Sequence, residues 1–141
     1  MERDENAETF GILIVEDEHL VALSLCLLIS QAPGYRVTGS AATMEQAVAL
    51  SERDPPDLAL LDLRLANGQS GLDVAGYLRL RDISCLFLTG NPPPAPRPDL
   101  AIGCLPKPFH DDSLMAALDI ARGMVRGNGL AGPLPPGLQL Y

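Results

Sequence analysis

Short apolar stretches alternate with amphipathic stretches along most of the chain. Five short stretches, most of them unbroken apolar runs, have the length and composition of β-strands: residues 10–15, 35–39, 58–61, 85–89 and 101–105. Four longer stretches carry apolar residues at helical spacing: residues 18–31, 43–53, 71–81 and 110–126. Because unbroken apolar runs suit parallel strands covered on both faces, the alternation predicts an α/β fold with a doubly wound parallel sheet.

Prolines interrupt this alternation between the fourth and fifth predicted strands. Residues 91–98 read Asn-Pro-Pro-Pro-Ala-Pro-Arg-Pro, where a further helix would be expected. Proline has no backbone N–H to donate, and its ring clashes with the preceding helical turn. The sequence therefore predicts an extended, polyproline-like loop, with the fourth helix missing or much reduced.

The two ends of the chain show no regular pattern. Residues 1–9 are acidic and polar, and residues 127–141 are rich in glycine and proline. We expect both ends to be flexible tails, because neither can bury an apolar face. Residues 10–126 then form one domain.

Composition and charge narrow the class of protein. The net charge of −8 argues against a nucleic-acid partner, because phosphate backbones are bound by clusters of Lys and Arg. The longest strongly apolar stretch, residues 20–29, is too short to span a bilayer, and residues 1–9 do not resemble a signal peptide. We therefore expect a cytoplasmic protein without a membrane partner. The cysteines lie in apolar runs without C-x-x-C spacing and are predicted to be buried thiols: Cys26, Cys85 and Cys104.

Chemically active side chains stand at the ends of four predicted strands. They end or follow the first, third, fourth and fifth strands: Glu16 and Asp17, Asp62, Thr89, and Lys107. Ligands of open parallel sheets bind beyond the carboxyl ends of the strands, where these side chains would converge. Three carboxylates, a hydroxyl and an ammonium group predict a site for a divalent metal and a phosphoryl group.

Each of these residues also has an ordinary structural explanation. Acids suit the N-terminus of a helix, and an aspartate after a strand is typical of a turn. A threonine is typical of strands, and a lysine is typical of a solvated surface. Four such coincidences at converging strand ends are improbable, so we favour the site.

Four motifs, in this order and spacing, resemble the receiver domain of two-component response regulators. They are Ile-Leu-Ile-Val-Glu-Asp-Glu (12–18), Pro-Asp-Leu-Ala-Leu-Leu-Asp-Leu-Arg-Leu (56–65), Phe-Leu-Thr-Gly (87–90) and Leu-Pro-Lys-Pro-Phe (105–109). Each motif alone is weak, but their order and strand-end placement together are specific. The resemblance covers residues 10–126 and implies a flavodoxin-like, five-stranded parallel sheet in the order 2-1-3-4-5 with helices on both faces.

The resemblance implies a role for each residue at the strand ends. Asp62 stands where the family accepts a phosphoryl group from a sensor histidine kinase, Lys107 would pair with that group, and Thr89 would hydrogen-bond one of its oxygens. Mg²⁺, or Mn²⁺ in its place, would be held by Glu16, Asp17, Asp62 and the backbone carbonyl of Arg64. Residues that would flank the site are Gly90, Asn91 and Pro108, with a cis bond between Lys107 and Pro108.

Two features depart from the usual pattern of the family: Cys104, and the proline-rich segment 91–98 in place of the fourth helix. Cys104 stands three positions before Lys107, where typical receivers carry an aromatic residue that moves when the threonine follows the phosphoryl group. A coupled movement of this kind is therefore not expected of Cys104. The Phe-Leu-Thr-Gly motif partly resembles an atypical subgroup marked by Phe-Ala-Thr-Gly, whose members often stand alone and pair with histidine kinases of the HWE type.

The first predicted helix carries more leucine than one buried face needs. Leu20, Leu23 and Leu27 form a second stripe, here called the outer leucine stripe, beside the residues that would face the sheet. Scattered surface leucines are common and would explain it. The sharper interpretation is a docking face for a kinase or for a second copy of the chain in a homodimer.

The leading functional prediction is a single-domain response regulator that is not an enzyme beyond slow autodephosphorylation. It would signal by contact with a downstream protein or drain phosphoryl groups from a kinase. One alternative is a pseudo-receiver, a binding module that uses the fold without phosphorylation. A phosphohydrolase of the haloacid-dehalogenase type would need an aspartate two residues after Asp62, and that residue is Arg64.

Overall fold

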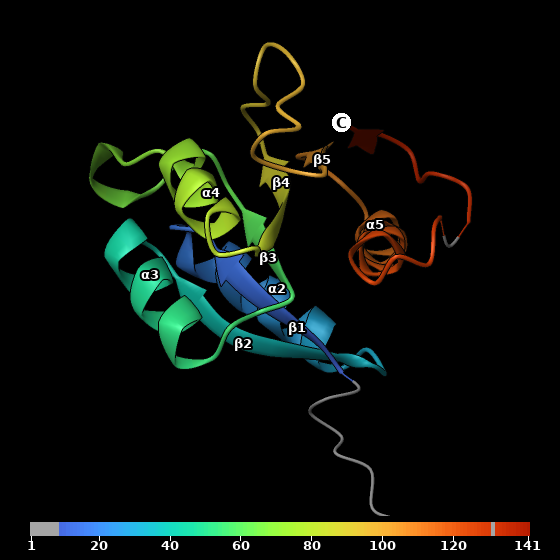
Figure 1. Cartoon of the computed structure of the whole chain (residues 1–141), viewed down its shortest axis with the longest axis horizontal. Coiled ribbons are helices and arrows are strands. Elements are labelled where there is room, and N and C mark those ends of the chain that lie inside the picture. Colours follow the sequence, from blue (N-terminus) through green and yellow to red (C-terminus); the bar gives the residue numbers. More distant parts are fainter. Residues whose placement is uncertain (1–8, 131) are drawn as a thin grey trace, which may run out of the picture.

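The computed structural model describes residues 9–130 and 132–141, and its described residues form one six-stranded sheet in the order β2-β1-β3-β4-β5-β6 (Figure 1). The strands are β1 (Phe10–Val15), β2 (Tyr35–Ala41), β3 (Leu58–Leu61), β4 (Ser84–Thr89), β5 (Gly103–Pro106) and β6 (Gln139–Leu140). The first five strands pair in parallel, in the predicted order, and β6 pairs antiparallel with β5. The predicted flavodoxin-like α/β fold is confirmed, with one antiparallel strand more than expected.

Helices cover both faces of this sheet. They are α2 (His19–Ser30), α3 (Met44–Arg53), α4 (Gly71–Arg79) and α5 (Asp111–Val125), with a 3-10 turn, η1 (Ala66–Gly68), before α4. Helices α2 and α5 pack into one core cluster, and α3 and α4 into a second cluster on the opposite face. Figure 1 shows α3 and α4 together on one side of the sheet. None of the helices in the described part of the chain is long and apolar enough to cross a membrane.

The continuous apolar run of β1 follows from its central place in the sheet. Successive side chains of a strand point to opposite faces. Ile12 and Ile14 therefore reach the cluster under α2 and α5, while Leu13 and Val15 reach the cluster under α3 and α4. All four are fully buried, which explains why the strand reads as an unbroken apolar run rather than an alternating one.

The parallel register brings several strand ends to the same edge of the sheet. Val15 pairs with Leu61, and Thr89 pairs with Pro106, each at or next to the end of its strand. The amide of Asp62 donates to the carbonyl of Val15 at 2.9 Å, and the amide of Lys107 donates to the carbonyl of Thr89 at 2.9 Å. The residues that directly follow β3 and β5, Asp62 and Lys107, therefore lie at the same edge of the sheet.

The segment between β4 and β5 contains no helix within the described residues 90–102, as the prolines predict. It is not a single extended stretch, however, because the backbone bends at Pro94 and Ala95 and turns at residues 98–100. Arg97 and Asp99 form an ion pair with an N–O distance of 3.0 Å close to this turn. The polyproline-like loop of the sequence prediction is therefore folded back on itself.

Residues 138–141 pack against the sheet and differ in this from the flexible tail predicted over residues 127–141. Gln139 and Leu140 form β6, Leu138 is buried, and the amide of Tyr141 donates to the carbonyl of Ile102 at 3.0 Å. The open edge of β5 offers unpaired backbone groups, and a short extended segment satisfies them. Two paired residues are too few to produce a recognisable strand pattern in the sequence. Of the predicted N-terminal tail, residues 1–8 lie outside the described residues.

Candidate functional site

The structure brings the predicted side chains together at the carboxyl edge of the sheet. They come from the ends of β1, β3, β4 and β5: Glu16 and Asp17, Asp62, Thr89, and Lys107. Glu16, Asp62 and Thr89 are buried, whereas Asp17 is exposed. The site therefore combines three buried side chains with one acidic side chain that is exposed to solvent.

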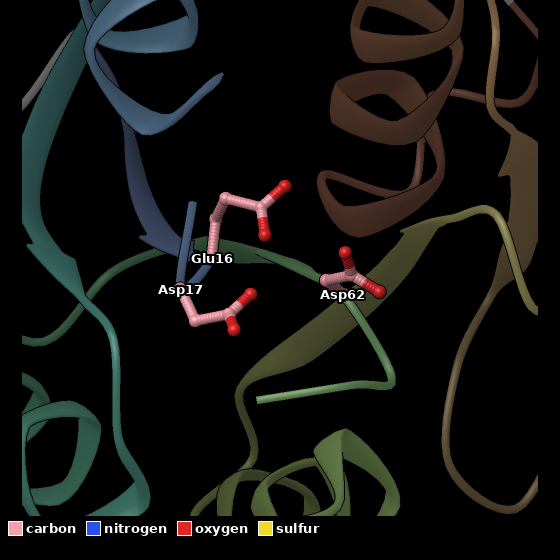
Figure 2. A group of neighbouring side chains, drawn as sticks. All are labelled: Glu16, Asp17 and Asp62. Carbon is pink, nitrogen blue, oxygen red and sulfur yellow. The ribbon is translucent and has the colours of Figure 1, made fainter. Parts of the chain in front are cut away.

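Three carboxylates form the acidic part of this site. Glu16, Asp17 and Asp62 each offer one carboxylate oxygen, and these oxygens lie within 4.8 Å of one another. Figure 2 shows the side chains of Glu16 and Asp17 extending from the end of β1 toward the side on which Asp62 follows β3. Grouped carboxylate oxygens are the ligands that hard divalent cations such as Mg²⁺ prefer.

Lys107 joins the two buried carboxylates of the cluster. Its ammonium group donates to Oδ2 of Asp62 at 2.9 Å and also to the carboxylate of Glu16. Burial lowers the pKa of Lys107, but the hydrogen bonds to Glu16 and Asp62 outweigh it, and the net pKa lies above the usual value. Burial raises the pKa of Glu16, and the bond from Lys107 offsets this only in part. The ammonium group therefore stays charged at neutral pH.

The second oxygen of Asp62 is held by two other donors. Its Oδ1 accepts from Oγ1 of Thr89 at 2.8 Å and from the backbone amide of Arg64 at 3.2 Å. Burial raises the pKa of Asp62, yet the hydrogen bonds from Lys107, Thr89 and the Arg64 amide bring its net pKa below the usual value. Asp62 is thus an ionised carboxylate with both oxygens oriented, as a nucleophile at neutral pH must be.

The other predicted residues lie around this centre. Gly90 is exposed, and a Cβ atom there would meet open space, so the position beside Thr89 is unobstructed. The amide of Asn91 donates to Oγ1 of Thr89 at 3.0 Å, and the bond between Lys107 and Pro108 is cis. The side chain of Arg64 is exposed, and its backbone amide donates to Oδ1 of Asp62.

The outer leucine stripe is exposed along α2, at 75% for Leu20, 46% for Leu23 and 55% for Leu27. An apolar groove beside it is lined by α2 and by the segment that follows β5. Its lining residues are Leu20, Val21, Ser24, Leu25, Leu28, Phe109 and Asp111. Phe109 lies two residues after Lys107, so this groove adjoins the edge of the sheet that holds Asp62.

Gly71 supports the site, although its place in the sequence indicates only the start of a helix. Its amide donates to the carbonyl of Leu63 at 2.8 Å, which holds the loop after β3 against the start of α4. A Cβ atom at Gly71 would lie 2.1 Å from the backbone carbonyl oxygen of Asp62. The glycine therefore permits a backbone approach that no other residue allows, and only this long-range contact reveals it.

Replacing Gly71 with alanine is expected to lower the free energy of unfolding by about 1–3 kcal/mol, because the added methyl group collides with backbone that cannot rotate away. Urea denaturation measures the loss. Gly76→Ala is the matched control in the same helix, since its Cβ would come no nearer than 3.8 Å to a side-chain atom of Leu100. An equal stability of Gly71→Ala and wild type would contradict the crowding inferred at Asp62.

Comparisons with known proteins agree with this site. The family model of the response regulator receiver domain matches residues 12–119. The chain is 37% identical over 115 residues to the phyllosphere-induced regulator PhyR of Methylorubrum extorquens, covering 78% of this chain and 42% of that protein. It is 38% identical over 113 residues to the positive alginate biosynthesis regulatory protein of Pseudomonas aeruginosa, covering 77% of this chain and 45% of that protein.

The fold has a close counterpart among solved structures. The receiver (REC) domain of PhyR from Erythrobacter litoralis superposes with a TM-score of 0.71 at 26% identity, covering 91% of this chain and 97% of that domain. The chain spans less than half the length of the two full-length relatives above, so the similarity concerns one domain of each. On the match to the family model, and on these relatives, the chain belongs to the response regulator receiver domain family.

Proposed function

We propose that this chain acts as a response regulator whose Asp62 accepts a phosphoryl group from a sensor histidine kinase. The observation that supports the proposal is the arrangement around Asp62. One of its oxygens faces the ammonium group of Lys107 at 2.9 Å and the other faces the hydroxyl of Thr89 at 2.8 Å. An ionised carboxylate between a cation and a hydroxyl donor, beside two further carboxylates, suits phosphoryl transfer better than a structural role does.

The proposed chemistry needs no proton transfer at Asp62. A carboxylate oxygen of Asp62 attacks the phosphorus atom of a phosphohistidine, the P–N bond breaks, and the imidazole nitrogen leaves with the bonding electrons. Lys107 neutralises charge on the phosphoryl oxygens, and the hydroxyl of Thr89 donates to one of them in place of Oδ1 of Asp62. Positioning and charge neutralisation dominate reactions of this kind, and these residues supply both.

The charge of the cluster supports a divalent cation at the same place. Three carboxylates share one paired cation, Lys107, among the residues that the structure describes, so negative charge is in excess. Glu16, Asp17 and Asp62, with the backbone carbonyl of Arg64, would hold Mg²⁺ or Mn²⁺. Such a cation, when bound, reduces the repulsion between the carboxylates and the incoming phosphoryl group.

Removal of the metal tests this proposal directly. Incubated with acetyl phosphate and Mg²⁺, the wild-type chain is expected to gain one phosphoryl group by intact mass. With EDTA it is expected to gain none, because the acidic cluster then repels the donor. Titration with beryllofluoride and Mg²⁺, followed by NMR, covers the case of a receiver that accepts only from its kinase. No response to either reagent would contradict the proposal and favour the pseudo-receiver.

The kinase is proposed to dock on the outer leucine stripe and the groove beside it. The three exposed leucines of α2 and Phe109 form an apolar surface that adjoins the edge of the sheet where Asp62 lies. A donor histidine can reach Asp62 only if the protein that carries it rests close to this edge. An amphipathic helix of the kinase, such as one of the HWE type, suits this surface because its own apolar face can fill the groove.

The output of the phosphorylated chain is proposed to be a contact with a downstream protein, or the removal of phosphoryl groups from the kinase. The net charge of −8 disfavours a nucleic-acid partner for this segment. Hydrolysis of the acyl phosphate is expected to be slow, because the described side chains that hydrogen-bond Asp62 are those of Lys107 and Thr89, and both are donors rather than general bases for water.

A further inference from the structure

Residues 138–141, here called the edge segment, close the side of the sheet next to β5. Leu140 pairs with Gly103, Gln139 pairs with Cys104, and the amide of Tyr141 donates to Ile102 at 3.0 Å. Figure 1 shows this dark red end of the chain beside β5. A strand of two residues has few hydrogen bonds to lose, so its docking is the kind of local contact that opens without unfolding the domain.

The side chains of the edge segment reach both cores of the protein. Leu138 and Leu140 join the cluster under α2 and α5, whereas Tyr141 joins the cluster under α3 and α4. The ring of Tyr141 meets the ring of Phe87 edge-on, with 6.2 Å between the ring centres and 67° between the planes. The hydroxyl of Tyr141 lies near the thiol of Cys104, and burial first, then this thiol, raises the pKa of the phenol to about 12.

Strand β4 connects this contact to Asp62. Phe87 lies two residues before Thr89, so both side chains lie on the same face of the strand. Thr89 is fully buried, and its hydroxyl donates to Asp62 at 2.8 Å. Strand β4 thus carries both Phe87, whose ring packs against Tyr141, and Thr89, whose hydroxyl donates to Asp62.

We propose that the docking of the edge segment is coupled to the occupancy of Asp62, and that a phosphoryl group on Asp62 tightens the packing of Tyr141. This inference rests on the proposed function of Asp62. A phosphoryl group places new acceptor oxygens beyond the carboxylate, and the hydroxyl of Thr89 turns outward to reach one. Because protein cores are close-packed, a movement of Thr89 is expected to shift Phe87, two residues earlier on the same face of β4, and through Phe87 the ring of Tyr141 that packs against it.

Gly103 provides a variant that loosens the edge segment without shortening the chain. A Cβ atom at Gly103 would lie 2.5 Å from the backbone carbonyl oxygen of Gln139, so Gly103→Ala pushes β6 away. Tyr141→Ala removes the ring contact and leaves the backbone pairing in place. This variant replaces Gly103→Ala in the test if Gly103→Ala fails to fold. Gly76→Ala is the matched control, because it adds a methyl group in α4 without crowding.

Hydrogen exchange of the Tyr141 amide, with beryllofluoride and Mg²⁺ as the phosphoryl analogue, tests the coupling. In wild type and Gly76→Ala we expect exchange to slow by about five-fold or more on addition of the analogue, the lower end of typical allosteric coupling. Since coupling is reciprocal, Gly103→Ala and Tyr141→Ala are expected to weaken beryllofluoride binding by a similar factor.

Two outcomes separate the inference from the function on which it rests. If beryllofluoride shifts the resonances of Thr89 and Gly90 but leaves the exchange of Tyr141 unchanged, the coupling is refuted and the proposed function stands. If beryllofluoride shifts no resonance near Asp62, the proposed function fails and the coupling fails with it. Equal beryllofluoride affinity of wild type, Gly103→Ala and Tyr141→Ala would likewise overturn the coupling.

Discussion

Asp62→Asn is expected to take no phosphoryl group from acetyl phosphate in the presence of Mg²⁺, whereas the wild-type chain takes one. The amide has nearly the shape of the carboxylate and can still accept from the hydroxyl of Thr89. It lacks the negative charge and the second nucleophilic oxygen that now faces Lys107 at 2.9 Å. The loss should therefore be complete rather than partial, because among the described residues no other carboxylate accepts from both a lysine ammonium group and a threonine hydroxyl.

Intact mass spectrometry after a fixed incubation measures the outcome. Asp73→Asn is the control, because Asp73 is an exposed carboxylate in the first turn of α4, outside the acidic cluster. It should take one phosphoryl group, as wild type does. A phosphoryl group that appears on Asp62→Asn as readily as on wild type would show that another side chain is the acceptor.

The second large effect is expected from charges placed on the outer leucine stripe. The double substitution Leu23→Glu and Leu27→Glu should slow phosphoryl transfer from a histidine kinase that phosphorylates the wild-type chain by about 30-fold or more, because the loss of a hot-spot contact costs about 2 kcal/mol or more and about 1.4 kcal/mol is a factor of ten. Both side chains are about half exposed, so the folded domain can accept the charges. Labelling by acetyl phosphate, which needs no docking surface, should be unchanged.

Leu80→Glu is the matched control for this experiment. Leu80 is 84% exposed at the end of α4, on the opposite face of the sheet from α2. Its replacement should leave transfer from the same kinase unaffected. If the double variant receives phosphoryl groups from the kinase at the wild-type rate, the kinase docks elsewhere. If light scattering shows that it has instead lost a dimer that wild type forms, the stripe is a contact between copies.

Much of the fold and the location of the site could be predicted from the sequence because both depend on local patterns. A central parallel strand is covered on both faces, so it must be apolar throughout, as β1 and β3 are. Polar residues can begin only where the strand leaves the core. Asp62 and Lys107 therefore mark strand ends in the sequence as clearly as they do in space, and parallel register then makes those ends meet.

Other features depend on contacts between segments that are distant in the sequence. The need for glycine at Gly71 arises from a carbonyl nine residues earlier, and the need for glycine at Gly103 arises from a backbone 36 residues later, at Gln139. Neither glycine lies in a left-handed turn that would mark it in the sequence. The bends in the proline-rich segment likewise follow from its fixed ends on β4 and β5, not from its composition.

By itself, the sequence determined the alternation of strands and helices, the loss of the fourth helix and the set of chemical groups at the strand ends, because periodicity and proline act locally. Only the tertiary structure decided that the last residues form β6 and that Tyr141 lies against Cys104 and Phe87. The physical reason is that an edge strand of two residues is stabilised by the sheet that it joins rather than by its own propensity.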